Sequence, residues 1–396
     1  MIELGTTDEE GKLVFQADLP HGKYYIQEVE HKPGYLPNDE VCSFDASYTD
    51  QTLELLAFSE EISNQPTITE FTKVDLTGGQ EIEGAKMQIL DQEGKVVEEW
   101  VSKKEAHVVY ALAPGEYILH EEQAPTEQGY VRAEDVKFVV EETGDVQKVK
   151  MEDDHTKVSI SKTDITDGKE IEGAKLQILD QDGEVVESWT TGEEHLIEYL
   201  PVGTYTLHEE AAVDGYIVAN DVEFTVEETG EIQKVKMEDE RAMGQLVIVK
   251  TDTDSKAALE GVEFVLLEKE TGKEVGRLKT GKDGKAVSEL LPIGTYENGV
   301  FKEPITYVLK ETATLKGYEK TEEEWEIVFT YQNDKTPVIE VVKEIQNKKI
   351  PETPGTVKPG PKTGDDTNWF LPLLALGVSA GMVAGLLYYR KRHKKA

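Results

Sequence analysis

The chain has 396 residues, of which 80 are acidic and 42 basic, so its formal net charge is -38 at pH 7. Such a charge repels phosphates and excludes nucleic acid as a partner. Because 38% of the residues are hydrophobic and recur periodically, the chain is not a disordered acidic tail. The single cysteine, Cys42, excludes an intrachain disulfide framework and a cysteine-based zinc site.

An internal repeat runs along the chain. Residues 71–100 read FTKVDLTGGQEIEGAKMQILDQEGKVVEEW, and residues 160–189 read ISKTDITDGKEIEGAKLQILDQDGEVVESW. A looser third copy begins at 248–278, and each copy continues through a Gly-Tyr pair to a last strand. Residues 19–65 carry only the second half of the pattern. Since the N-terminus also lacks a signal for export, we expect the chain to be truncated there.

Within each copy, short apolar runs alternate with polar residues and are separated by turns such as DQEG and GKDG. This period of two predicts an all-β fold of tandem antiparallel β-sandwiches. The expected order is a truncated sandwich at 1–65, complete sandwiches at 66–154, 155–240 and 241–350, a Pro- and Gly-rich spacer at 351–368, a transmembrane helix at 369–389 and a basic tail at 390–396.

Each complete copy places three charged or polar side chains on the apolar face of a strand. Alternate residues of a strand share a face, so the buried side of Leu119 also carries Glu121. The same test on the first and last strands adds a lysine and an Asp or Asn. The full set is Lys73, Glu121 and Asp153, then Lys162, Glu209 and Asp239, then Lys250, Glu311 and Asn347.

Such groups must pair, neutralise or react, because an unpaired buried charge is costly. A neutral lysine amine held against a carboxyl or carboxamide carbon can attack it, with the glutamate as proton carrier. The product is an isopeptide bond, and water or ammonia leaves. The alternatives are snorkelling surface lysines, solvated acidic turns and an unreacted buried ion pair. The recurrence in three copies favours the cross-link.

The C-terminus predicts an anchor. Residues 369–389 form an uncharged apolar run that is long enough to span a bilayer, and RKRHKK follows at once. The positive-inside rule puts that basic cluster in the cytoplasm and everything before it outside. The alternative is a buried core helix.

The pattern KTDxxxGxxIxGAKxQILD, followed by YxLxE, GY and a terminal Asp or Asn, resembles the Cna protein B-type (SpaA-type, prealbumin-like) domain of Gram-positive surface proteins. The resemblance extends to about residue 350 and implies β-sandwiches that often carry a self-catalysed isopeptide bond. It implies the pairs Lys73–Asp153, Lys162–Asp239 and Lys250–Asn347, with Glu121, Glu209 and Glu311 as their catalysts. Glu28 and Asn64 match the family positions in the first copy, whose lysine would lie before Met1.

Residues Pro361, Lys362, Thr363 and Gly364, with the apolar run and the basic tail, resemble a cell-wall sorting signal. Gly360 stands where that motif usually has leucine. The resemblance implies that a sortase cuts between Thr363 and Gly364 and joins the threonine to a peptidoglycan precursor. We therefore expect a surface protein that is wall-anchored, or held in the membrane if it is not sorted.

The function expected from these features is structural and non-enzymatic: a stalk of cross-linked sandwiches that needs no cofactor and no metal. Two alternatives stay open. One is an adhesin whose domains bind a host matrix protein or a glycan. The other is a pilin subunit that a sortase assembles through a surface lysine.

Overall fold

A computed structural model describes residues 1–47 and 57–351. The described residues form β-strands and one short 3-10 helix. The predicted sorting motif at 361–364 and the predicted transmembrane helix at 369–389 lie outside these residues. In the described ranges, no helix is both long and apolar enough to cross a membrane.

The N-terminal segment contains one antiparallel pair of strands, β1 (Gly22–Gln27) and β2 (Val41–Ala46). Their side chains alternate between half-buried and exposed. This pair is the regular structure of the N-terminal segment within the described residues.

The first complete sandwich consists of two four-stranded sheets, ordered β6-β3-β10-β8 and β5-β4-β7-β9. The elements are β3 (Ile68–Asp75), β4 (Lys86–Leu90), β5 (Val96–Val101), β6 (His107–Tyr110), β7 (Gly115–Gln123), the 3-10 helix η1 (Thr126–Gln128), β8 (Tyr130–Val131), β9 (Val136–Val140) and β10 (Val146–His155).

The second sandwich repeats this topology, with sheets β14-β11-β18-β16 and β13-β12-β15-β17. Its strands are β11 (Lys157–Asp164), β12 (Lys175–Leu179), β13 (Val185–Thr190), β14 (His195–Glu198), β15 (Gly203–Ala211), β16 (Tyr216–Ile217), β17 (Val222–Val226) and β18 (Ile232–Arg241).

The third sandwich keeps the plan and adds a hairpin where its sequence carries the ENGVFKEP insertion. One sheet has β19 paired with β22, β23 and β28, and the other is ordered β21-β20-β26-β27. Its strands are β19 (Met243–Asp252), β20 (Glu263–Glu268), β21 (Glu274–Lys279), β22 (Lys285–Val287), β23 (Leu291–Pro292), the hairpin strands β24 (Gly294–Glu297) and β25 (Val300–Pro304), β26 (Thr306–Ala313), β27 (Glu324–Val328) and β28 (Val338–Asn347).

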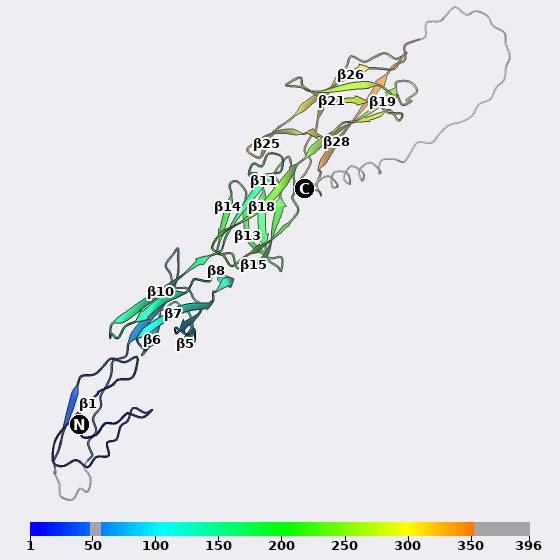
Figure 1. The fold of residues 1–396 in the computed structure, drawn as a ribbon. Helices are drawn as coiled ribbons and strands as arrows, with labels where there is room; N and C mark the ends of the chain where they lie inside the picture. Colours follow the sequence, from blue (N-terminus) through cyan, green and yellow to red (C-terminus); the bar gives the residue numbers. More distant parts are fainter. Residues whose placement is uncertain (48–56, 352–396) are drawn as a thin grey trace, which may run out of the picture. The chain divides into compact units, whose positions relative to one another are not determined.

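The first and last strands of each complete sandwich lie side by side and run parallel. Figure 1 shows this for β19 and β28. The other strand pairs are antiparallel, as expected for antiparallel β-sandwiches. Parallel neighbours need a long crossover, and here the intervening strands of the sandwich supply it. The C-terminal ends of the first and last strands are therefore brought together.

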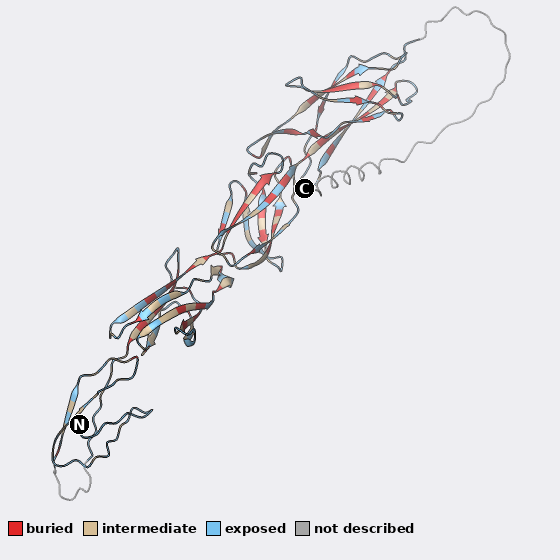
Figure 2. Ribbon diagram, in the orientation of Figure 1, coloured by how far each residue is buried: buried red, intermediate tan, exposed pale blue. Residues whose placement is uncertain are grey.

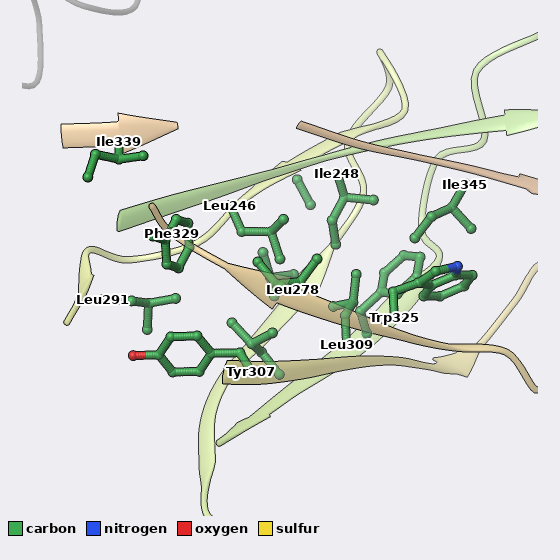
Figure 3. Packing of buried hydrophobic residues seen from close by; sticks show 14 of the residues in the cluster. Leu246, Ile248, Leu278, Leu291, Tyr307, Leu309, Trp325, Phe329, Ile339 and Ile345 are labelled. Carbon is green, nitrogen blue, oxygen red and sulfur yellow. The ribbon is translucent and has the colours of Figure 1, made fainter. Parts of the chain in front are cut away.

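Each sandwich has its own apolar core between its two sheets. Figure 2 shows buried and exposed residues alternating along the strands. In the third sandwich, Leu246 and Ile248 of β19 face Tyr307 and Leu309 of β26 (Figure 3). This packing buries every second residue of β19 and, toward the C-terminal ends of the last strands β18 and β28, the alternate residues there as well.

Gly244 of β19 provides a test of this packing. A Cβ atom placed there would lie 2.2 Å from the ring of the fully buried Phe329. We expect Gly244→Ala to lower the free energy of unfolding of the third sandwich by about 1–3 kcal/mol, because the ring cannot move without disturbing the core. Differential scanning calorimetry measures the shift of the corresponding transition.

The matched control is Gly276→Ala in β21, where an added Cβ meets nothing within 4 Å. It should leave the transition unchanged or raise it slightly, since alanine reduces the freedom of the unfolded chain. Equal effects of the two substitutions would contradict the packing argument.

Candidate functional site

The predicted triad of the first sandwich meets between its two sheets. Lys73 comes from β3, Glu121 from β7 and Asp153 from β10, and all three side chains are buried. The Nζ atom of Lys73 lies 2.9 Å from Glu121 Oε2 and donates a hydrogen bond to Asp153 Oδ1. The alternation of these strands places each polar residue on the same face as its apolar neighbours, so the three converge at one end of the core.

The second sandwich repeats this geometry with Lys162 of β11, Glu209 of β15 and Asp239 of β18. Lys162 Nζ lies 2.9 Å from Glu209 Oε2 and donates to Asp239 Oδ1. All three residues are at most 2% exposed, so water cannot solvate their charges.

The third sandwich has an asparagine where the others have an aspartate. Lys250 Nζ of β19 lies 3.2 Å from Glu311 Oε2 of β26 and donates to Asn347 Oδ1 of β28. The amide nitrogen Nδ2 of Asn347 donates to Glu311 Oε1 at 2.7 Å and to the hydroxyl of Thr314 at 2.7 Å. The chemistry of the acceptor thus changes the hydrogen bonding around it.

Burial controls the ionisation of these clusters. It raises the pKa of Asp153 to about 7 against the attraction of Lys73, and the adjacent Glu121 carboxylate adds to the rise. The pKa of Asp239 is raised to about 7 in the same way by burial and Glu209, against Lys162. Burial also lowers the pKa of Lys250, although Glu311 opposes it. These shifts favour neutral acceptors and a neutral amine.

Backbone amides hold the glutamates of the two aspartate sites. Ala133 N donates to Glu121 Oε2 at 2.7 Å, and Ala219 N donates to Glu209 Oε2 at 2.6 Å. These donors could not be predicted from the sequence, because a backbone N–H leaves no side-chain signature.

A second carboxylate holds the backbone of each lysine in the two aspartate sites. Lys73 N donates to Glu81 Oε2 and Lys162 N to Glu170 Oε2, both at 3.1 Å. These glutamates open the repeated EIEG motif. The motif could have indicated them, but nothing in its spacing shows that it lies beside the lysine.

The structure also brings together Glu28 and Asn64 in the N-terminal segment. Asn64 Nδ2 donates to both oxygens of Glu28, at 2.9 and 2.7 Å. Within the described residues no lysine forms an ion pair with Glu28. These two residues therefore take the arrangement of a glutamate and its acceptor, without the third member.

All nine predicted residues of the complete copies thus converge in three buried clusters. Each cluster holds an amine, a carboxyl or carboxamide group and a glutamate that can exchange a proton with both. Such a set can condense to an amide or persist as a network of buried hydrogen bonds and ion pairs.

Four stretches of the chain match the sequence model of the SpaA family, described as a prealbumin-like fold domain: residues 2–58, 67–155, 156–241 and 244–304. Together they include more than half of the chain. The chain belongs to the SpaA prealbumin-like domain family. No curated protein is similar enough in sequence to match it.

Several solved structures resemble this SpaA-family chain. The Bacillus anthracis TIE protein is 26% identical, with a TM-score of 0.49 over 78% of this chain and 55% of that protein. The chain therefore spans little more than half of the TIE protein. BcpA, the major pilin subunit of Bacillus cereus, is 15% identical, with a TM-score of 0.41 over 72% of this chain and 99% of BcpA. The shaft pilin SpaA of Lactobacillus rhamnosus GG is 15% identical, with a TM-score of 0.21 over 50% of this chain and 99% of SpaA.

Proposed function

We propose that the chain is a structural surface protein whose β-sandwiches are each fastened by a self-catalysed isopeptide bond. The observation that carries the proposal is the buried contact between an amine, an acceptor and a glutamate in all three complete copies. The proposed bonds are Lys73–Asp153, Lys162–Asp239 and Lys250–Asn347. Glu121, Glu209 and Glu311 are the proposed proton carriers.

The reaction follows from the geometry of the clusters. The lone pair of the neutral lysine Nζ forms a bond to the side-chain carbonyl carbon of the acceptor. The glutamate takes a proton from Nζ and returns it to the leaving oxygen or nitrogen. The C–O or C–N bond then breaks, and water leaves an aspartic acid or ammonia leaves an asparagine. Because the three groups are fixed in contact, a normally slow condensation becomes effectively unimolecular.

The position of the bond explains its mechanical value. Tension enters a sandwich at the start of its first strand and leaves at the end of its last strand. In the first sandwich, a bond from Lys73 to Asp153 passes this tension directly from β3 to β10. The segment between these two residues then carries no load. Unfolding by force and proteolysis of the opened chain are both suppressed.

The proposed attachment uses the sequence C-terminal to the sandwiches. A sortase would cleave between Thr363 and Gly364 and join the chain to a peptidoglycan precursor, after residues 369–389 had held it in the membrane. The basic residues that follow this apolar run support that order of events. The sandwiches would then stand outside the cell.

The mass of the purified, denatured chain tests the cross-links. We expect a mass below the sequence mass by two waters and one ammonia, because two acceptors are aspartates and one is asparagine. Peptide mapping should assign each loss to its lysine–acceptor pair. A mass equal to the sequence mass would contradict the cross-linking mechanism.

Substitution of one glutamate should remove one bond. In Glu121→Ala, the peptides that carry Lys73 and Asp153 should stay unlinked, without the mass loss of one water. The other two bonds should form. By the loop-closure argument for covalent cross-links, the first sandwich should lose about 4 kcal/mol of stability. Mass spectrometry and calorimetry measure the two effects.

The matched control is Glu122→Ala. Its carboxylate lies one residue further along β7 on the exposed face, with a side-chain exposure of 58%. This variant should form all three bonds. If Glu121→Ala still formed the Lys73–Asp153 bond at the normal rate, Glu121 would not be the proton carrier.

The two kinds of acceptor should also differ in pH dependence. An aspartic acid reacts only while protonated, and the pKa of Asp153 and Asp239 in the folded chain is about 7. As pH rises through this value, their bond formation should slow relative to the Lys250–Asn347 bond, approaching tenfold per pH unit. The carboxamide of Asn347 does not ionise in this pH range, so its reactivity as an acceptor should not change in this way.

This comparison requires protein in which the isopeptide bonds have not yet formed. Protein isolated unfolded in urea from inclusion bodies can be diluted into buffers of different pH and quenched at intervals. The ratio of water loss to ammonia loss is then read from one sample, so that a general effect of pH on folding cancels. A ratio that is constant across pH would show that protonation of the aspartates does not limit their reaction.

A further inference from the structure

One position beside the cluster changes together with the acceptor. Strands β7, β15 and β26 end two residues after their glutamates, and the next residues are Ala124, Ala212 and Thr314. These three positions are equivalent, because each glutamate lies opposite the second residue of β4, β12 or β20 and is followed by the same register shift. The third sandwich, which has threonine at this position, is also the one whose acceptor is an asparagine.

The threonine completes the hydrogen bonding of the asparagine amide. A carboxamide has two N–H donors, and those of Asn347 go to Glu311 Oε1 and to Thr314 Oγ1, both at 2.7 Å. Its oxygen accepts from Lys250. Every polar atom of the Asn347 side chain therefore has a partner, and the amide is fixed with its oxygen toward the lysine and its nitrogen toward the glutamate.

The aspartate sites do not need a second acceptor. A carboxylic acid has at most one O–H, and Asp153 Oδ2 and Glu121 Oε1 are both buried without another partner among the described residues. The two side chains interact with each other, and a single proton is enough for one hydrogen bond between them. The next residue, Ala124, is 2% exposed and presents only a methyl group. An asparagine at 153 would have one N–H without an acceptor there.

We propose that Thr314 is a specificity-determining positioning residue, which allows the third sandwich to use a carboxamide as acceptor, whereas Ala124 and Ala212 restrict their sites to a carboxylic acid. The inference rests on the proposed isopeptide reaction. Thr314 accepts the N–H that Glu311 does not, and so holds Nδ2 where Glu311 can deliver the proton taken from Lys250. The bond from Lys250 Nζ to the Asn347 carbonyl carbon forms, the bond to Nδ2 breaks, and ammonia leaves.

The loss-of-function test replaces the hydroxyl with a methyl of the same size. In Thr314→Val, the Lys250–Asn347 bond should form roughly tenfold more slowly or worse, because one buried N–H has no acceptor. Thr314→Ser should react at the normal rate. In the double variant Thr314→Val/Asn347→Asp, fast reaction should return with loss of water, because an acid does not need the hydroxyl. A purely structural role for Thr314 would not give this recovery.

The gain-of-function test transfers the pair to the second sandwich, where Ala212 is half-buried, whereas Ala124 of the first is fully buried. Asp239→Asn alone should react slowly, and Ala212→Thr/Asp239→Asn should recover and release ammonia. The full chain is refolded from urea, and each bond is followed by the mass of its peptide pair. The unaltered bonds in the same molecule serve as the internal control for folding.

The outcomes separate this inference from the proposed function. If the unaltered chain forms no bonds, the proposed function fails, and the inference fails with it. If the unaltered chain forms all three bonds but Thr314→Val reacts as fast as Thr314→Ser, the inference is overturned and the function stands. Equal rates for Asp239→Asn with and without Ala212→Thr would overturn it as well.

Discussion

In each complete sandwich, the first and last strands lie next to each other in parallel, and the remaining strands fill the path between them. This pairing brings the C-terminal ends of the two strands together, where one carries the lysine and the other the acceptor. An antiparallel pairing would have placed the C-terminal end of one strand beside the N-terminal start of the other. The glutamate comes from the facing sheet, so the two sheets must pack before the cluster is complete. Folding therefore precedes any chemistry.

The clusters are costly until they are complete. Each one puts an amine and one or two carboxyl groups among residues that water does not reach, and loss of a single partner from a buried ion pair costs about 3–5 kcal/mol. The proposed condensation would remove this cost, because the product amide is neutral and the lysine could no longer carry a charge. The same burial that makes the groups unstable as ions therefore favours the neutral forms that react. The proposed reaction would give a sandwich of this size a covalent cross-link without cysteine, in a chain whose single cysteine is Cys42.

Hydrophobic alternation was sufficient to predict the β-sandwich class and the inward direction of the nine polar residues. Glu121 follows Leu119 on a strongly patterned strand, so its burial could be predicted from the chain alone. The parallel pairing of the first and last strands could not be predicted, because alternation fixes the face on which a residue lies but not the direction of the neighbouring strand. The backbone donors at Ala133 and Ala219 also escaped prediction. Thr314 differs visibly from Ala124 and Ala212 in the repeats, but its contact with Asn347 depends on the fold.

The two kinds of site place the mobile proton differently. In the first sandwich, Glu121 Oε2 accepts a hydrogen bond from the Ala133 amide and lies 2.9 Å from Lys73 Nζ. Burial and the neighbouring Glu121 raise the pKa of Asp153 to about 7, which favours the protonated acid that the amine attacks in the proposed reaction. In the asparagine site, both N–H groups of the acceptor are engaged, and the structure shows no backbone donor to Glu311 among the described residues. In the proposed reaction, Glu311 carries the proton to the leaving nitrogen. In the third sandwich, the carboxamide acceptor thus has a second hydrogen-bond acceptor in Thr314, and its glutamate takes no backbone donor among the described residues.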